Sequence, residues 1–137
     1  MTAMHQLKHN KMKNELGQTM TEFALVLPIL VVLMLGIVQF GLAFNNYVTL
    51  TDAVRAGARK AAVSRNASDP AGTCRSAVLA AGTNLDATEL GSNLSCTSSW
   101  APGSEVTVHA DYPYSIKILN WSVYSGRLNS TMKERVE

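Results

Sequence analysis

Residues 23–44 read FALVLPILVVLMLGIVQFGLAF and contain no charged side chain. At about 1.5 Å per residue, a helix over this run is about 33 Å long, enough to cross a hydrocarbon core of about 30 Å. A helix in a soluble protein is rarely apolar on every face for about six turns. The run therefore predicts one membrane-spanning helix that begins at Phe23 and ends at Phe44.

Three residues inside the run affect how this helix packs. Pro28 lies near its start, where we expect it to kink the helix rather than end it, because neighbouring groups in a membrane re-satisfy the freed backbone. Gly36 and Gly41 leave room for another helix to approach. Their spacing differs from the GxxxG pattern of tight helix pairs, so they indicate no particular dimer.

The main alternative to a permanent anchor is a cleaved secretory signal peptide. Gly41, Leu42 and Ala43 form a small-x-small triplet that could serve as a cleavage site, and a cut after Ala43 would release a secreted protein. However, the apolar region of a signal peptide usually has about 7 to 15 residues, and this run is longer. We therefore favour the anchor and keep the secreted protein as an alternative.

The charges beside the run do not decide its orientation. Three basic residues precede it and three follow at similar distances: Lys8, Lys11, Lys13, Arg55, Arg59 and Lys60. Loops on the cytoplasmic side carry an excess of such residues, and here the two sides are nearly equal. The formal net charge of +2 comes from the residues before Gln18, after which acidic and basic residues balance. No clustered basic surface is expected, so we predict no nucleic-acid partner.

The residues just before the run form the most specific pattern in the chain. They read KNELGQTMTEF over residues 13–23, with Gly17 and Gln18 followed by Glu22. A carboxylate at the edge of a membrane helix is costly and is a functional candidate. The ordinary explanation is a helix start, at which Glu22 would favour the positive end of the helix dipole and Thr19 or Thr21 would cap the first turn.

This junction resembles the prepilin leader of type IV pilin-like proteins. The resemblance implies that a prepilin peptidase cuts between Gly17 and Gln18 on the cytoplasmic side. It also implies that Glu22 pairs with the amino terminus of a neighbouring subunit. The chain would then comprise a leader (1–17), a transmembrane and assembly helix (18–44) and a small extracytoplasmic domain (45–137).

A second resemblance is narrower. The stretch EFALVLPILVVLMLGIVQFG, followed by NNYVTLTDAVRAGARKAAV at 45–63, looks like the TadE family of the tight-adherence (Tad/Flp) pilus system. VTVHADYPYSI at 106–116 and TMKERVE at 131–137 resemble the family more loosely.

The resemblance implies a minor pilin or pseudopilin, which is a peptidase substrate and not an enzyme, in a pilus used for adherence or secretion. The implied partners are the prepilin peptidase, other pilin subunits, the pilus assembly platform and membrane lipid, without a cofactor or small-molecule substrate. The implied location is the bacterial cytoplasmic membrane, with the N-terminus inside, the C-terminal domain outside and possible incorporation into an extracellular pilus. The alternative is an uncleaved single-span membrane protein whose domain binds an envelope partner.

The helix is expected to continue from residue 45 to about residue 64. A polar stripe and a face of mostly small residues both recur at helical spacing. The stripe contains Asn45, Thr49, Asp52, Arg55 and Arg59, and the small face contains Val54, Gly57, Ala58, Ala61 and Ala62. We expect the small face to pack against the domain's own strands, with contact to a partner as the alternative.

The rest of the domain is expected to be α+β, with a C-terminal antiparallel pair of strands covering the helix. We predict a loop over 66–73, a short helix over 74–85, irregular structure over 86–104 and a strand over 106–112. A second strand over 128–136 would follow a long connection over 116–126. Two strands alone are marginally stable, so they must pack against the helix.

The chain has two cysteines, Cys74 and Cys96. Outside the cytoplasm they would form a disulfide, whereas in a reducing compartment they would be free thiols. The three histidines suggest no metal site, because His5 and His9 lack a further ligand and His109 stands alone on a strand. An aromatic group near the C-terminus could face a membrane interface or a partner, or cap the core: Tyr112, Tyr114, Trp121 and Tyr124.

Overall fold

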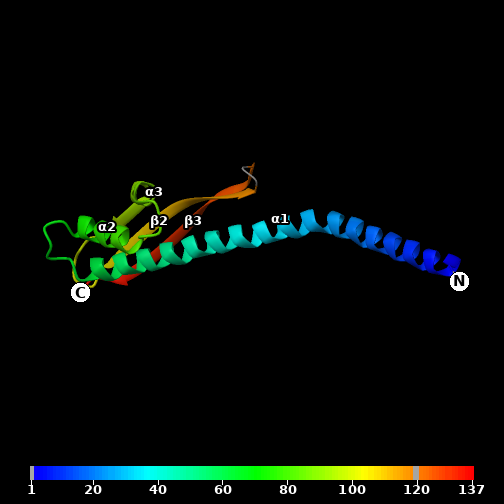
Figure 1. Ribbon diagram of the computed structural model, residues 1–137. Helices are drawn as coiled ribbons and strands as arrows, with labels where there is room; N and C mark the ends of the chain where they lie inside the picture. Colours follow the sequence, from blue (N-terminus) through cyan, green and yellow to red (C-terminus); the bar gives the residue numbers. More distant parts are fainter. Residues whose placement is uncertain (1, 119–120) are drawn as a thin grey trace. The chain divides into compact units, whose positions relative to one another are not determined.

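The computed structural model describes residues 2–118 and 121–137, with side chains described over 18–117 and 121–137. The chain forms two compact units, of which the first ends at Val38 and the second is Gln39–Glu137. Along the chain the described elements are α1 (Thr2–Ala62), α2 (Pro70–Ala81), α3 (Ala87–Ser92), β1 (Leu94–Thr97), β2 (Glu105–Ile118) and β3 (Trp121–Arg135) (Figure 1). The predicted α+β class is confirmed.

The first unit consists of α1 up to Val38. The helix continues through Pro28, as the sequence predicted. From Gln18 onward the side chains of this unit are exposed, with partial cover only near Leu35 and Gly36. This unit therefore has no hydrophobic core within its described side chains.

In the second unit, α1 runs on to Ala62, close to the predicted end at residue 64. The small face is buried, which confirms packing within the domain. Gly57 shows how close this packing is, because a Cβ built on it would lie 2.2 Å from Cγ2 of Val78 in α2. On the opposite side Asp52 and Arg55 stay exposed and form an ion pair at 3.6 Å.

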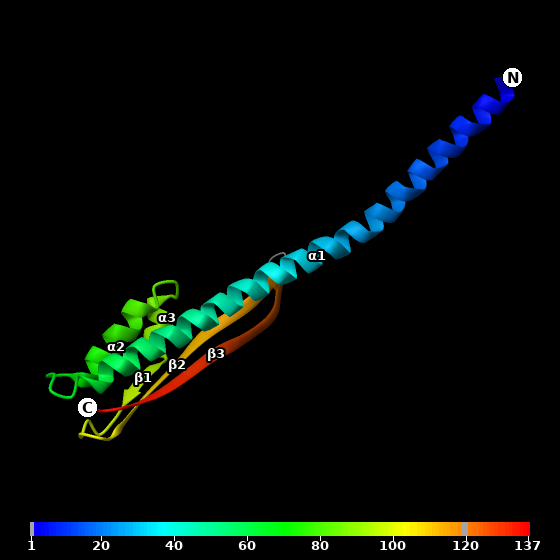
Figure 2. The same ribbon diagram turned by 90° about the horizontal axis from the view of Figure 1, so that it is seen from below.

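The sheet is antiparallel with strand order β1-β2-β3, so the predicted pair of strands gains a third (Figure 2). β2 and β3 form a long hairpin, in which Glu105 pairs with Arg135 and Ile118 with Trp121. Pro113 lies inside β2, where a proline would interrupt a central strand. It is tolerated because β1 pairs only with Thr107 to Ala110, so β2 is an edge strand on that side by residue 113.

α2 begins earlier than predicted. The expected loop over 66–73 ends at Asp69, whose carboxylate accepts a hydrogen bond from the Gly72 amide at 2.8 Å and caps the helix. Pro70 occupies the first turn, where its missing N–H is not needed. The helix ends at Ala81 rather than at Leu85, so the predicted bounds were wrong at both ends.

The expectation of irregular structure over 86–104 was confirmed for 98–104 and wrong for the residues before them. Asp86 caps α3 by accepting hydrogen bonds from the amides of Thr88 and Glu89, at 2.9 and 3.0 Å. β1 follows directly and pairs with β2, from Leu94 opposite Ala110 onward. A polar sequence with a weak hydrophobic pattern thus forms two short elements, each held by partners distant in sequence.

The long connection expected over 116–126 is strand up to the turn between β2 and β3. Gly126 had suggested a loop, but it lies directly opposite Tyr114. A Cβ on Gly126 would meet the Tyr114 ring at 3.0 Å. The glycine therefore makes room for an aromatic ring across the hairpin, and the strand continues past it.

The core of the second unit lies between α1, α2 and the sheet. Its buried members are mostly Ala, Val and Leu, which makes the core thin: Leu50, Ala53, Val54, Ala58, Ala61, Cys74, Val78, Leu85, Leu90, Leu94, Val106, Val108, Ala110 and Val136. The Glu137 amide donates to the Ala62 carbonyl at 3.0 Å and holds the chain's last residue beside the end of α1.

Candidate functional site

A continuous apolar surface on α1 is the most extensive candidate site in the described structure. Its large side chains are mostly exposed, from Met20 to Val48. The most apolar window has a mean hydropathy of 2.7, and α1 is the described helix that is long and apolar enough to cross a membrane. Exposure of this much apolar surface to water would be unfavourable, so it requires cover from lipid or protein.

Both ends of the predicted span are exposed, although they belong to different units. Phe23 belongs to the first unit and is 61% exposed, whereas Phe44 belongs to the second unit and is 59% exposed. Neither is covered by the domain's core. The core begins at Leu50, which is the first buried residue of α1 among those with described side chains.

Gly36 and Gly41 leave depressions in this apolar surface. A Cβ built on either glycine would meet no atom of the chain within 4 Å. At Gly57, in the same helix, the corresponding space is occupied by Val78 of α2. The two earlier glycines therefore offer backbone that a second helix can approach closely.

The junction before the apolar surface is helical and polar. Gly17 and Gln18 lie within α1, and the Gln18 side-chain amide donates a hydrogen bond to a Glu22 oxygen at 3.0 Å. Because α1 begins at Thr2, neither Thr19 nor Thr21 lies at a helix start. The helix-start explanation for these residues therefore does not apply before the leader is removed.

The two cysteines are joined. Cys74 of α2 and Cys96 of β1 form a disulfide with their Cα atoms 6.4 Å apart. The bond ties α2 to the edge strand of the sheet. Arg75, the next residue in α2, reinforces the same junction by donating to the carbonyls of Leu94 and Gly91 at 3.0 and 2.9 Å.

Within the described part of the chain, no cluster of three or more His, Cys, Asp or Glu side chains could hold a metal ion. His109 lies on the sheet, with Nδ1 2.7 Å from the Thr131 hydroxyl and Nε2 3.4 Å from a carboxylate oxygen of Asp111. It is a surface histidine with local partners, as predicted. The side chains of His5 and His9 lie outside the described residues.

The aromatic group near the C-terminus divides into two parts, which the sequence alone did not separate. Tyr112 packs against the core, and its hydroxyl accepts a hydrogen bond from the Asp86 amide at 3.1 Å. Tyr114 and Tyr124 face each other across the hairpin, with ring centroids 6.0 Å apart. Trp121 is 82% exposed.

The ionisation of Tyr114 is affected by this position. Partial desolvation raises its pKa above the usual value of 10.0, and the neighbouring Tyr124 adds to the shift. The hydroxyl of Tyr114 therefore stays neutral at physiological pH, so Tyr114 adds no charge to the far half of the hairpin.

Comparison with known proteins finds one family match, which lies within α1. Residues 17–59 match the model of a family described as TadE-like protein. The match begins at Gly17 and includes Glu22, the apolar surface and most of the small face. No curated protein matches the chain, and no solved structure matches it.

Proposed function

We propose that this chain, a TadE-like protein associated with Tad pilus systems, is a minor pilin or pseudopilin that assembles through the exposed apolar surface of α1. One observation carries the proposal: one face of this helix is buried by its own domain from Leu50 onward, whereas in the described part of the chain its large side chains between Met20 and Phe44 are exposed or only partly covered. A subunit that moves from lipid into a filament needs such a surface. Lipid covers it first, and the helices of other subunits cover it after assembly.

The proposal includes cleavage between Gly17 and Gln18 by a prepilin peptidase. The cut removes the charged leader and creates an ammonium group at Gln18. Glu22 lies one helical turn further on, and the Gln18–Glu22 hydrogen bond shows that these positions share a helix face. Within a bundle of apolar helices, an unpaired ammonium would be strongly unfavourable, and the Glu22 carboxylate of a neighbouring subunit offsets its charge.

In this proposal the second unit lies outside the cytoplasm and the N-terminus lies inside. The disulfide supports this orientation, because such bonds persist in oxidising compartments and are rare in the cytosol. The protein is then the substrate of a peptidase and a partner of other pilin subunits and of the assembly platform, and it performs no catalysis itself.

The experiment is an intact-mass measurement on the protein from its native membrane. A chain beginning at Gln18 supports the proposal. A chain beginning at Met1 would indicate an uncleaved membrane protein whose domain binds an envelope partner, and a chain beginning at Phe44 would indicate a secreted protein. Each of these two results contradicts the proposed function.

Two variants test which peptide bond is cleaved. Gly17→Asp should leave residues 1–17 attached, because it replaces the small residue before the proposed cleavage bond with a charged one. Ala43→Leu alters the small-x-small triplet and should leave processing unchanged. If Gly17→Asp protein were still cut before Gln18, the prepilin assignment of this junction would be wrong.

A further inference from the structure

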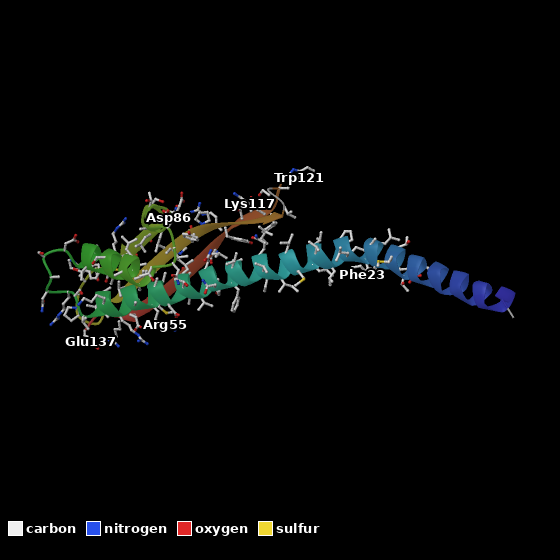
Figure 3. All side chains as sticks on the ribbon, viewed as in Figure 1. Phe23, Arg55, Asp86, Lys117, Trp121 and Glu137 are labelled. Carbon is white, nitrogen blue, oxygen red and sulfur yellow. A yellow bond between two sulfur atoms is a disulfide. The ribbon has the colours of Figure 1, made fainter. Side chains whose placement is uncertain are left out.

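The far half of the β2–β3 hairpin, here the hairpin tip (residues 113–126), has a composition unlike the rest of the sheet. In the sequence it contains one charged residue, Lys117. Its described apolar side chains are unusually exposed, with Trp121 at 82%, Val123 at 63% and Tyr124 at 58%. Figure 3 shows Trp121 and Lys117 together at this end of the hairpin. Their exposure shows that the domain's own core does not cover them.

The hairpin tip reaches the level at which α1 becomes apolar. The Glu137–Ala62 hydrogen bond fixes the base of the hairpin beside the end of α1. From there β2 extends over 14 residues, or about 46 Å at about 3.3 Å per residue. From Ala62 back to Phe44, α1 rises about 27 Å. Even if the hairpin is tilted from the helix axis, these lengths allow its tip to reach the level of Phe44, where the predicted membrane-spanning run ends.

The side chains at this level are those found where a bilayer meets water. Trp and Tyr are enriched at this interface, because an apolar ring with one polar group fits the headgroup region. Lysine side chains near it extend their ammonium groups towards water. α1 contributes to the same zone with Tyr47, which is 45% exposed and follows Phe44 by three residues.

The backbone of the hairpin tip limits how deeply the tip can enter a bilayer. β3 is one of the two edge strands of the sheet, and within the described residues β2 has no partner strand on its other side beyond Ala110. Their unpaired N–H and C=O groups need water or headgroups, and open sheet edges do not occur in the hydrocarbon region. The tip is thus suited to the headgroup zone and unsuited to the hydrocarbon core.

We propose that the hairpin tip rests in the headgroup interface of the bilayer that α1 crosses, on the side of the membrane where the domain lies. It provides a second membrane contact, which restricts rotation and tilting of the domain about the α1 helix. The contact must be released when a subunit leaves the bilayer. The inference rests on α1 spanning the membrane and is independent of cleavage at Gly17.

The test uses the full-length chain in phosphatidylcholine vesicles, whose lipids carry bromine either near the ester linkage or near the chain end. Bromine quenches tryptophan fluorescence at short range. The chain has two tryptophans, and Trp100 packs against the domain's core. Subtracting the signal of the Trp121→Phe variant from that of the unmodified chain isolates Trp121.

We expect Trp121 to be quenched by bromolipid, roughly twofold more strongly by bromine near the ester linkage than by bromine near the chain end. A matched control places a tryptophan at the opposite end of the domain, in a Val63→Trp and Trp121→Phe double variant. Val63 is 61% exposed and follows the last residue of α1. This tryptophan should respond to aqueous iodide and not to bromolipid.

Three results would overturn the proposal. Quenching of Trp121 by iodide without quenching by bromolipid would place the tip in water. Protection from both quenchers that appears only at high protein density would assign the tip to a second copy of the chain. Stronger quenching by the deep bromine would place it in the hydrocarbon. None of these results depends on whether the leader is removed, so failure here is distinct from failure of the proposed processing.

Discussion

The two parts of α1 form one helix but have opposite surroundings. From Leu50 to Ala62, one face carries mostly Ala and Gly and is buried against the domain. Between Phe23 and Phe44 the side chains are large, apolar and exposed. Small residues suit a helix that must approach a sheet and a second helix closely, whereas large apolar residues on every face suit lipid or a bundle of identical helices. Among the described side chains, the later part of α1 is therefore the part that is packed against the protein's own domain.

The largest effect is expected at the start of the exposed part. Glu22→Gln removes the carboxylate that is proposed to offset a neighbour's ammonium group. Leaving such a charge buried and unpaired costs about 3–5 kcal/mol, so incorporation into filaments should fall by more than about a hundredfold. The measurement is the amount of this subunit in purified filaments, with processing followed by intact mass.

Glu89→Gln is the matched control, because Glu89 is an exposed carboxylate in α3 of the second unit. It should be cut and incorporated normally. If Glu22→Gln were incorporated as well as Glu89→Gln, Glu22 would have no role in assembly.

The disulfide offers a test confined to the domain. Cys74→Ser with Cys96→Ser removes a bond that closes a sequence separation of 22 residues. The double variant should lose about 3 kcal/mol of unfolding free energy, since the unfolded chain regains the freedom of this loop. Denaturant unfolding in detergent, followed by circular dichroism, would measure the loss. The unmodified protein under reducing conditions should match the variant, and equal stability with and without reductant would contradict this role.

A glycine pair compares the two parts of α1 directly. Gly57→Val should destabilise the domain by about 1–3 kcal/mol, because even a Cβ would lie 2.2 Å from the Val78 side chain. Gly41→Val places the same side chain where no atom of the chain lies within 4 Å. It should leave domain unfolding in detergent unchanged. Equal losses from both substitutions would mean that contact with Val78 is not the cause of the effect.

The smallest expected effect concerns the hairpin tip. Tyr124→Phe removes the neighbouring hydroxyl, so the pKa of Tyr114 should fall towards its usual value while remaining raised by desolvation. Because the folded-state pKa is raised, the associated stability is present below the usual pKa of about 10 and is lost as the pH rises through the folded value. An ultraviolet absorbance titration, with Tyr114→Phe to assign the transition, would measure the shift. An unchanged pKa in Tyr124→Phe would exclude this interaction.

The sequence predicted the apolar run of α1 and the small face that follows it, because length, charge and helical spacing determine them directly. It also identified the two cysteines as a pair, although the pairing depended on the compartment. The sequence did not predict the short elements α3 and β1, and the predicted bounds of α2 were wrong. The signals at Asp69 and Asp86 were present, since each precedes a helix and caps it, but the weak hydrophobic pattern after them did not indicate a helix.

The hairpin could not be read from local pattern either. Pro113 and Gly126 are residue types that disfavour strands, and each is accommodated because of its position in the hairpin. Pro113 lies where β1 has ended, and Gly126 lies beneath Tyr114. Residues 116–118 and 121–126 therefore form strand because they pair across the hairpin. The candidate assembly surface was predictable because it depends on the amino-acid composition of one helix. The hairpin tip was not predictable because it depends on the pairing of β2 with β3.

The central claim is that the exposed part of α1 meets other subunits after the leader is removed. Single cysteines at Gly36 and Ala53 test it, because Gly36 faces open space and Ala53 is buried in the domain. Oxidation of whole cells should join Gly36→Cys subunits into dimers and leave Ala53→Cys subunits monomeric, and adding Gly17→Asp should abolish the Gly36→Cys dimer. Absence of a Gly36→Cys dimer, or its persistence in the Gly17→Asp background, would contradict the account.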